Sequence, residues 1–195
     1  MTQGGFDQPR LRKAHRIIGS RLVLRNAEVD DARFIWQLRR DPHRARHLSA
    51  VPDDPQAQVE WLQAYAQDDE QAYFMVTDAN LGERLGTVRL YGAQGDAFSW
   101  GSWLLKPGVP AHFAIESALM VYHYARQLGF KSAYFTVRQD NTSVWRFHER
   151  FGARRVMAKA GQFEYALDAD ALACALQRYA RYLPDGIAVE SGENT

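Results

Sequence analysis

The chain has 195 residues, a formal net charge of +1 and 46% hydrophobic residues, values that are typical of a globular protein and exclude disordered, collagen-like and membrane-spanning chains. Its single cysteine, Cys174, excludes an internal disulfide and a cysteine-rich metal cluster, and Met1–Gly19 lacks the apolar segment of a secretory signal. We therefore expect a cytoplasmic protein without a metal, and the near-zero net charge predicts no binding to nucleic acid or to a membrane.

The first third of the chain is predicted to form one strand and two helices. Arg21–Arg25 alternates charged and apolar residues, which is typical of a strand. A helix that begins at Asp30 or Asp31 stops at Asp41, because a residue before proline is pushed out of the helical region. A second amphipathic helix is centred on Leu62.

Strands dominate the middle of the chain. The pattern predicts strands at Tyr73–Thr77, Thr87–Tyr91 and Phe98–Leu105. Ile115–Leu128 is apolar on nearly every side, which predicts a deeply packed helix, and Gly129 is its expected end.

The last third alternates strands and helices. Expected there are a strand at Ala133–Val137, a helix from Asn141 to Gly152, short strands near Val156 and Tyr165, and a final helix over residues 170–182. The last ten or so residues look frayed. This order of elements, with one buried central helix, favours an α+β layered fold.

Basic residues form a cluster after the first predicted helix: Arg39, Arg40, His43, Arg44, Arg46 and His47. The next segment, Val51–Glu83, contains acids but no lysine or arginine. Such charge runs are usually solvated faces. The alternative is that the basic cluster holds a ligand that carries phosphate.

Five blocks of sequence occur in a telling order and spacing: RLVLR, FIWQLRRDP, EWL, LGTVRLY and VRQDNTSVWRFHERFGA. Through them the chain resembles, from about Arg21 to Tyr165, the GNAT superfamily of N-acetyltransferases, in particular the branch related to ribosomal-protein N-acetyltransferases. The resemblance implies a mixed central sheet of about six to seven strands, with a splayed parallel pair and helices on both faces. It places the acetyltransferase domain at residues 20–168, between a basic extension (1–19) and a C-terminal helix with a frayed tail (169–195).

The resemblance also implies acetyl-coenzyme A as the acetyl donor. Its arm would lie in the gap between Phe98–Leu105 and Ala133–Val137, and its diphosphate at the start of the next helix, where backbone amides favour an anion. Val109 and Pro110 depart from the family's glycine-rich pattern at this point. The residues that the resemblance assigns to the cofactor are Trp103, Leu104, Leu105, Lys106, Ala111, His112, Phe113, Ala114, Asn141 and Val144.

His148 is the candidate catalytic residue. Many relatives place a tyrosine seven residues after the asparagine that corresponds to Asn141, where it protonates the leaving thiolate. A histidine titrates near neutral pH and can serve as acid or base, although His148 also fits simple packing on an apolar helix face, and Asn141 also fits a helix cap. The glutamate of some relatives is missing at Ser99–Gly101, so the base stays unassigned. Glu116, expected in the first turn of the central helix, and Glu164, on a late strand, are the nearby carboxylates considered.

The acceptor implied by the resemblance is a small molecule with an amine. The residues expected to contact it are Trp61, Arg89, Tyr91 and Trp100. Trp61 and Trp100 suit stacking on a sugar or nucleobase if their rings are exposed, and the alternative is that these aromatic residues form core.

The blocks GSWLLKPG and WRFHERFGA resemble acetyltransferases encoded with surface-polysaccharide genes, which act on nucleotide-linked aminosugars. The favoured hypothesis is therefore an N-acetyltransferase for such a sugar. The alternatives are an acetyltransferase for protein N-termini and a GNAT-like module that binds but does not catalyse. The last helix is compatible with closing the domain or with forming a homodimer.

Overall fold

The computed structural model describes residues 8–42, 47 and 52–192. Its helices are η1 (Val29–Asp31), α1 (Ala32–Arg40), α2 (Gln56–Ala66), α3 (Ala111–Gln127), α4 (Thr142–Arg150), α5 (Ala169–Arg178) and η2 (Ala180–Tyr182). Its strands are β1 (Arg16–Ile18), β2 (Leu22–Asn26), β3 (Ala72–Asp78), β4 (Arg84–Gln94), β5 (Ala97–Leu105), β6 (Ser132–Arg138), β7 (Arg154–Lys159), β8 (Gln162–Leu167) and β9 (Ala188–Glu190). The strands form one mixed sheet in the order β7-β8-β6-β5-β4-β3-β2-β1-β9, which confirms the predicted α+β fold with more strands than the six or seven expected.

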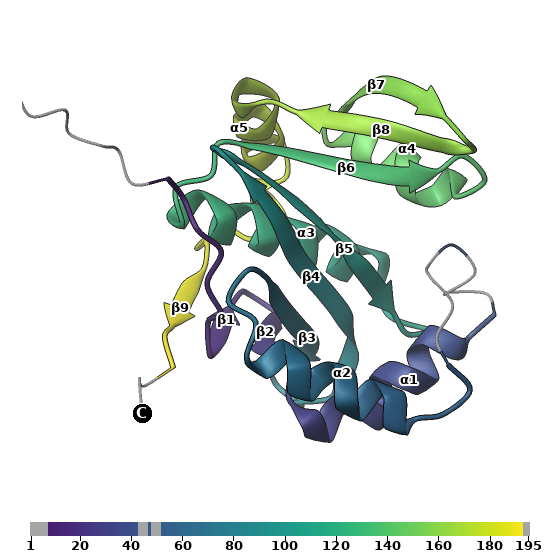
Figure 1. Ribbon diagram of the computed structural model, residues 1–195. Helices are drawn as coiled ribbons and strands as arrows, with labels where there is room; N and C mark the ends of the chain where they lie inside the picture. Colours follow the sequence, from purple (N-terminus) through teal and green to yellow (C-terminus); the bar gives the residue numbers. More distant parts are fainter. Residues whose placement is uncertain (1–7, 43–46, 48–51, 193–195) are drawn as a thin grey trace, which may run out of the picture.

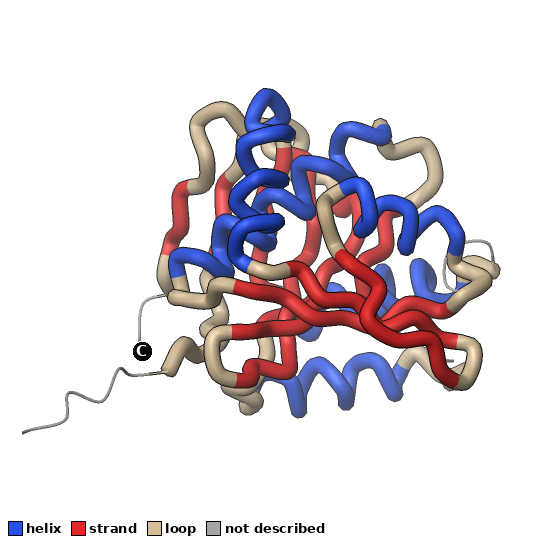
Figure 2. Tube along the Cα trace, turned by 90° about the horizontal axis from the view of Figure 1, so that it is seen from above, coloured by secondary structure: helices blue, strands red, loops and turns tan. Residues whose placement is uncertain are grey.

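Helices cover both faces of this sheet (Figures 1 and 2). On one face, which we call the α3/α4 face, α3, α4 and α5 enclose the larger core, with Phe98 and Leu119 fully buried. On the other, the α1/α2 face, α1 and α2 cover a smaller core that contains Ile35 and Met75. Because side chains alternate across a strand, Arg89 of β4 points to the α1/α2 face while its two neighbours lie in the larger core.

The parallel strands β5 and β6 separate soon after they begin. Their register contains only two pairs, Ala97 with Ser132 and Phe98 with Ala133. Beyond these pairs β6 continues against β8 alone, up to Arg138, and Figure 1 shows β5 and β6 diverging toward their C-terminal ends. The predicted splayed pair is therefore confirmed, and its gap opens between two halves of one sheet.

The central helix α3 is the buried helix that the sequence predicts, and it also holds a carboxylate in the core. Helix α3 begins at Ala111, so Glu116 is not in its first turn as expected, and the Glu116 side chain is fully buried. Its Oε1 accepts hydrogen bonds from the backbone N–H groups of Arg21 (2.6 Å) and Leu22 (3.1 Å). Glu116 thus joins α3 to the start of β2.

The two ends of the described chain meet in the sheet. The short strands β1 and β9 are antiparallel neighbours, with Ile17 opposite Val189. Leu11, Ala14 and Ile17, within the segment expected to precede the domain, are buried in the larger core. The expectation of a frayed tail is wrong for Ala188–Glu190, because a three-residue strand is too short to show periodicity and gains its order from its partner.

No helix in the described ranges is both long and apolar enough to cross a membrane. Within the same ranges, no group of three or more histidine, cysteine, aspartate or glutamate side chains is arranged to hold a metal ion.

Candidate functional site

The edge of β5 that faces the gap is shaped by a β-bulge. Between the pairs Thr87–Leu104 and Arg89–Gly101, β5 contains one residue more than β4. Ser102 takes up the extra length in the left-handed region, with φ of +46°, and its carbonyl accepts a hydrogen bond from the Thr87 hydroxyl at 2.8 Å. Such bulges and strained residues recur beside functional sites because they re-aim the chain.

Trp103, Leu104 and Leu105 follow this bulge and have no partner on β6. The side of the strand that faces the gap can therefore exchange hydrogen bonds with an extended ligand. These are the residues that the sequence assigns to the arm of acetyl-coenzyme A, and an arm with two amide groups fits this edge.

The start of α3 offers backbone amides next to the same edge. The first amides of a helix have no partner within it, Pro110 at the N-cap has no N–H, and the Phe113 amide donates to the Pro110 carbonyl at 2.9 Å. The groups left to bind an anion are the amides of Ala111 and His112, which suit a diphosphate. The side chain of Lys106 forms an ion pair with Glu83, so it is held over β4 rather than extended toward this helix.

His148 lies under the gap, among rings from both of its sides. Its imidazole packs on Phe135 of β6 with 4.0 Å between ring centroids, and it contacts Trp100 of β5 edge-on at 5.2 Å. The side chain is 5% exposed, and Nδ1 is buried without a hydrogen-bond partner in the described part of the chain. His148 thus packs on the apolar face of α4 and also meets the gap, and its catalytic role stays a prediction.

Burial lowers the pKa of His148 to about 3. Its ordinary value is about 6.5, so the ring is neutral at physiological pH. A neutral imidazole donates one hydrogen bond and accepts another. His148 is therefore a polar but uncharged group at the base of the gap.

Asn141 occupies the N-cap position of α4, but its side chain makes no capping hydrogen bond. The only contact of its Oδ1 in the described residues is a long one, 3.4 Å from the Ser143 hydroxyl. The side-chain capping considered for this asparagine is therefore wrong. Val144, one turn into α4, is partly buried against the larger core.

The two tryptophans expected to contact the acceptor lie on opposite faces of the sheet. Trp100 is 3% exposed, and its Nε1 donates to the Tyr122 hydroxyl at 3.2 Å in the larger core. The expected exposed ring at Trp100 is thus wrong, because its side chain points to the α3/α4 face. Trp61 of α2 lies half-buried on the α1/α2 face, stacked on Tyr65 at 5.7 Å.

Arg89 and Tyr91 lie together on the α1/α2 face. The guanidinium of Arg89 is 4.8 Å from the Tyr91 ring and 5.7 Å from the Trp61 ring. A Cβ atom added at Gly101 would lie 3.0 Å from the Tyr91 hydroxyl, so Tyr91 reaches across to β5 just before the bulge. The structure therefore brings Trp61, Arg89 and Tyr91 to one place, one strand away from the gap.

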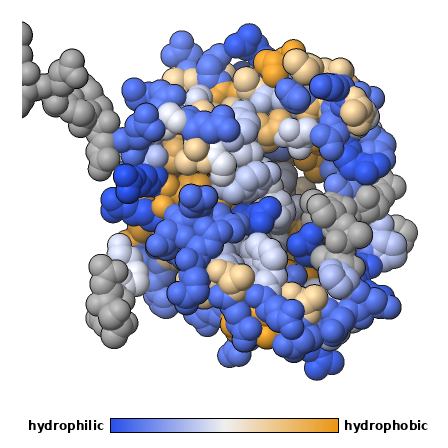
Figure 3. Space-filling model, viewed as in Figure 1, coloured by the Kyte–Doolittle hydropathy of each residue, from blue (hydrophilic) through white to orange (hydrophobic). Residues whose placement is uncertain are grey.

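Glu164 of β8 is exposed, and it lies opposite Thr136 of β6. Its neighbour Tyr165 faces the larger core, so Glu164 points to the α1/α2 face. Figure 3 shows that this side of the molecule is hollowed between the part that carries β6 to β8 and the part that carries β4 and α2. The absence of a carboxylate at Ser99–Gly101 leaves the base without an assignment.

The basic cluster after α1 is only partly described. Arg40 forms an ion pair with Asp53, and His47 Nδ1 lies 3.2 Å from Asp140 Oδ1, in the loop after β6. His43, Arg44 and Arg46 lie outside the described residues. A separate surface cavity of about 600 Å³ between α1 and α2 is lined by other residues, which include Trp36 and Val59.

Tyr73 and the side chain of Gln71 also lie beside Arg89, and no sequence pattern pointed to either of them. Tyr73 lies directly opposite Arg89 in the register of β3 and β4, and the Gln71 side chain accepts a hydrogen bond from Arg89 Nη1 at 3.2 Å. In the sequence Tyr73 is one of several large residues in a buried strand, so no local pattern distinguishes it. Only the pairing of β3 with β4 shows that it belongs beside Arg89.

Comparisons with known proteins agree with this geometry. The model of the acetyltransferase (GNAT) domain family matches residues 21–154. The structure is similar to that of apo FdhC, described as a nucleotide-linked sugar GNAT, with 29% identity, a TM-score of 0.76 and coverage of 89% of this chain and 99% of that one. A search of curated protein sequences finds no match.

Two more distant structures share the fold. A probable acetyltransferase from Chromobacterium violaceum has a TM-score of 0.72 at 17% identity, over 88% of this chain and 94% of that one. A chimera of the spermidine N-acetyltransferase SpeG from Vibrio cholerae and hSSAT has a TM-score of 0.66 at 18% identity, over 79% and 99%. With the family model covering most of the chain, and the splayed strands and the bulge in place, the protein belongs to the GNAT family and is an acetyltransferase.

Proposed function

We propose that this acetyltransferase transfers an acetyl group from acetyl-coenzyme A to the primary amine of a nucleotide-linked aminosugar. The observation that carries the proposal is the similarity to FdhC, described as a nucleotide-linked sugar GNAT, at 29% identity over 89% of this chain and 99% of that one. Both chains match over nearly the whole domain, so the similarity includes the elements that would surround the acceptor.

Acetyl-coenzyme A supplies the acetyl group as an activated thioester when it is bound. In this chain, the backbone groups of Trp103–Leu105 would hold its extended arm along the free edge of β5. The amides of Ala111 and His112 would hold its diphosphate. The side chain of Asn141, which makes no capping hydrogen bond to α4, would contact the arm from the other side of the gap. These contacts need no charged side chain, which agrees with Lys106 being paired to Glu83.

His148 would act as a neutral hydrogen-bond donor at the base of the gap. With a pKa of about 3, the ring carries no extra proton to release at neutral pH. An N–H group directed at the departing sulfur would still stabilise the charge that develops there, and more strongly in a dry apolar setting than in water. The acceptor amine must be neutral to attack, and water in the open gap can remove its proton.

The charge of the α1/α2 face supports an acceptor that is negative rather than positive. Arg89 and Arg39 both lie half-buried on this face, beside the half-buried ring of Trp61. A polyamine would meet two like charges here, whereas the diphosphate of a nucleotide-linked sugar would meet opposite ones. The two positive charges thus distinguish the proposed acceptor from the polyamine of the spermidine enzyme, which shares the fold.

The test is an acceptor panel with purified protein and acetyl-coenzyme A. The acceptors are UDP- and dTDP-linked aminosugars, the corresponding free aminosugars, spermidine and short peptides with free N-termini. Thiol release gives the rate, and mass spectrometry identifies a product heavier by one acetyl group. We expect turnover with at least one nucleotide-linked aminosugar at a kcat/KM at least about tenfold above that of the free sugar.

Calorimetric titration with acetyl-coenzyme A separates the remaining outcomes. Micromolar binding together with activity on peptides alone would replace the proposal with an acetyltransferase for protein N-termini. The absence of binding at millimolar concentration would favour a module without catalysis. The variant His148→Ala serves as the catalytic control, for which we expect binding of acetyl-coenzyme A to persist while kcat falls.

A further inference from the structure

Arg39, Tyr73 and Arg89 come from three different elements and meet on the α1/α2 face. Tyr73 and Arg89 are cross-strand partners in β3 and β4, which places their side chains side by side on the same face. Arg39 lies in the last turn of α1, one turn after the fully buried Ile35. Residues four apart lie on the same side of a helix, so Arg39 also faces the sheet.

Buried donors on this face point to a ligand. Nε of Arg89 is buried without a hydrogen-bond partner in the described part of the chain. Tyr73 is 2% exposed, and its hydroxyl, which makes no close hydrogen bond there, interacts with the hydroxyl of Thr87 on the neighbouring strand. The Thr87 hydroxyl itself donates to the Ser102 carbonyl. Buried polar atoms are nearly always satisfied in folded proteins, so the Nε–H group of Arg89, with the Tyr73 hydroxyl beside it, points to a ligand that supplies acceptors.

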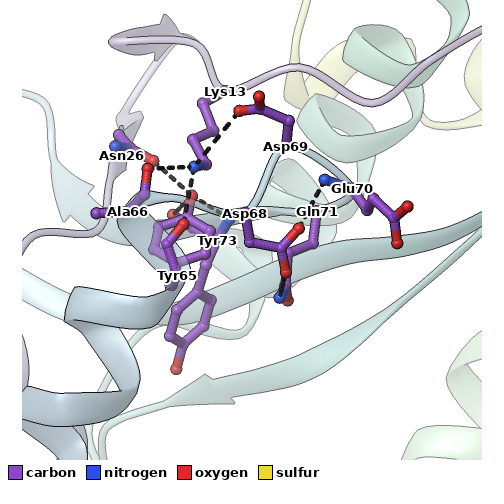
Figure 4. A network of polar contacts seen from close by, with 9 residues as sticks. All are labelled: Lys13, Asn26, Tyr65, Ala66, Asp68, Asp69, Glu70, Gln71 and Tyr73. Carbon is purple, nitrogen blue, oxygen red and sulfur yellow. Dashed lines mark hydrogen bonds and ion pairs between the residues drawn. The ribbon is translucent and has the colours of Figure 1, made fainter.

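A polar network fixes the position of these donors (Figure 4). The hydroxyl of Tyr65 accepts from the Tyr73 amide at 2.8 Å and donates to Asn26 Oδ1 at 2.6 Å. Lys13 Nζ donates to the carbonyl of Tyr65 at 2.8 Å, at the end of α2. The ring of Tyr73 extends away from this network. The backbone beneath the site is therefore rigid while the donor end stays open.

The two arginines make this place positively charged. In the described residues Arg89 forms no ion pair with an acidic side chain, and its Nη1 donates to the neutral amide of Gln71. The carboxylate of Asp68 interacts with it only at a distance, because Asp68 accepts hydrogen bonds from the Gln71 side chain and the Glu70 amide. Burial lowers the pKa of Arg39, and the charge of Arg89 lowers it further.

We infer that Arg39, Arg89 and Tyr73 form a binding site for the phosphate groups of the acceptor. Two guanidinium groups and a hydroxyl offer the several charge-assisted donors that a diphosphate needs. This inference rests on the proposed function, and it assigns to these residues the recognition of the charged half of the acceptor.

The location of the site suits an acceptor whose amine reaches the gap. Arg89 lies opposite Gly101 of β5, immediately before the bulged segment that faces the gap. Neighbouring strands are about 5 Å apart, so the phosphate groups would lie about two strand spacings from the acetyl group. A single sugar ring between the diphosphate and the amine bridges such a separation.

The direct test is calorimetric titration with inorganic pyrophosphate in the presence of saturating coenzyme A, which fills the anion site at α3. We expect Arg89→Gln and Arg39→Gln each to weaken pyrophosphate binding roughly tenfold or more, and Tyr73→Phe by a smaller factor. Arg126→Gln, an exposed arginine on α3, is the matched control and should leave binding unchanged. Unchanged binding in both Arg39 and Arg89 variants would overturn the inference.

Kinetics separate this inference from the proposed function. With a nucleotide-linked aminosugar, Arg89→Gln should raise KM roughly tenfold or more. With the free aminosugar as acceptor, kcat/KM should be the same in wild type and variant. Turnover of nucleotide-linked sugars without any effect of Arg39 or Arg89 would leave the proposed function standing and refute the site. Pyrophosphate binding that depends on Arg89, without turnover of any such sugar, would support the site and refute the proposed acceptor.

Discussion

Two clusters on the α1/α2 face each contain a pair of arginines, and they differ in what lies beside the charges. In the first, Arg25 and Arg84 share the fully buried carboxylate of Asp31, with Arg25 contributing hydrogen bonds of 2.8 and 3.0 Å and Arg84 one of 2.8 Å. In the second, Arg89 lies near Arg39 and donates to a neutral amide.

The difference indicates what each cluster is for. The carboxylate of Asp31 also accepts a hydrogen bond from the Glu28 amide at 2.9 Å, so its acceptor sites are filled from within the chain. Such a closed network holds η1 against β2 and β4 and has no room for a ligand. The cluster around Arg89 has the same kind of donors but no carboxylate in the place that Asp31 takes in the first cluster. Such an arrangement is expected where the substrate itself supplies the negative charge.

The largest expected effect comes from removing the internal anion. Asp31→Asn keeps the shape of the side chain but leaves two arginines without their counter-charge. Because Arg84 is partly exposed, we expect the lower end of the usual range, a loss of about 3 kcal/mol in the free energy of unfolding. Urea denaturation at pH 7, followed by tryptophan fluorescence, measures it. Asp69→Asn is the matched control at an exposed aspartate, expected to change stability by less than about 0.5 kcal/mol.

Asp31 also predicts a direction for the effect of acid. Burial opposes its ionisation, but hydrogen bonds from Arg25 and the Glu28 amide outweigh this and hold its pKa below the usual value of 3.8. The native state therefore binds the proton less readily than the unfolded chain, and the stabilisation present above pH 4 is lost as the pH falls below it. Equal stability of wild type and Asp31→Asn at pH 7 would remove the contrast between the two clusters.

His148 provides a second test, since it is a buried polar group that lies outside both arginine clusters. Its Nδ1 has no hydrogen-bond partner in the described part of the chain. Its pKa in the native state is about 3, against about 6.5 in the unfolded chain. Between these values the unfolded chain binds the additional proton, so the free energy of unfolding decreases as the pH falls, by about 2.3 kcal/mol from pH 6.5 to pH 4.5. Well above pH 6.5 the group has no effect on the free energy of unfolding.

His148→Leu removes this titration while keeping a similar volume. We expect its free energy of unfolding to decrease less steeply than that of the wild type between pH 6.5 and pH 4.5, with carboxylate effects common to both. Urea denaturation at half-unit steps of pH gives the two slopes. Identical slopes would mean that water reaches the ring, and that the hydrogen bond proposed for His148 is weakened by solvent.

Much of the fold could be predicted from the sequence, because its elements have strong local signals. The long apolar helix α3 and the alternating strands β4 and β5 each carry their own period, and glycines mark the ends of α3 and α4. The strands β1 and β9 have three residues each, too few for a period, and they form because β1 pairs with β2 and β9 pairs with β1. Their presence depends on the tertiary fold, which no local pattern encodes.

The candidate site was predictable only where the family pattern fixes a position. His148 and Asn141 follow from the closing block of sequence, and the ring of His148 lies between Phe135 and Trp100, the rings on the two sides of the gap. Trp100 was misplaced because alternation along β5 does not say which of its two faces the core covers, and Trp100 shares the face of its core partner Leu90. Tyr73 had no signal at all, since the polar surroundings of a buried hydroxyl are known only from the tertiary structure.

The smallest expected effect is the one that best distinguishes the two arginine clusters. Arg89→Gln removes a charge that repels Arg39, and it gives up contacts with the rings of Tyr91 and Trp61 that contribute on the order of 1 kcal/mol. These effects oppose each other, so the free energy of unfolding should change by less than about 1 kcal/mol, well below the loss for Asp31→Asn. Thermal unfolding with coenzyme A present measures it.

The stabilisation of the protein by added pyrophosphate then tests whether Arg89 is kept for a negatively charged ligand. At ten times its dissociation constant, a ligand that binds only the native state stabilises it by about 1.4 kcal/mol. We expect this increase in the wild type and its loss in Arg89→Gln. If Arg89→Gln instead destabilises the protein as much as Asp31→Asn does, Arg89 is part of the framework, and the open cluster is structural like the closed one. A neutral effect on stability combined with a lost response to pyrophosphate is the signature of a residue kept for its ligand, because its charge is then balanced only when the acceptor is bound.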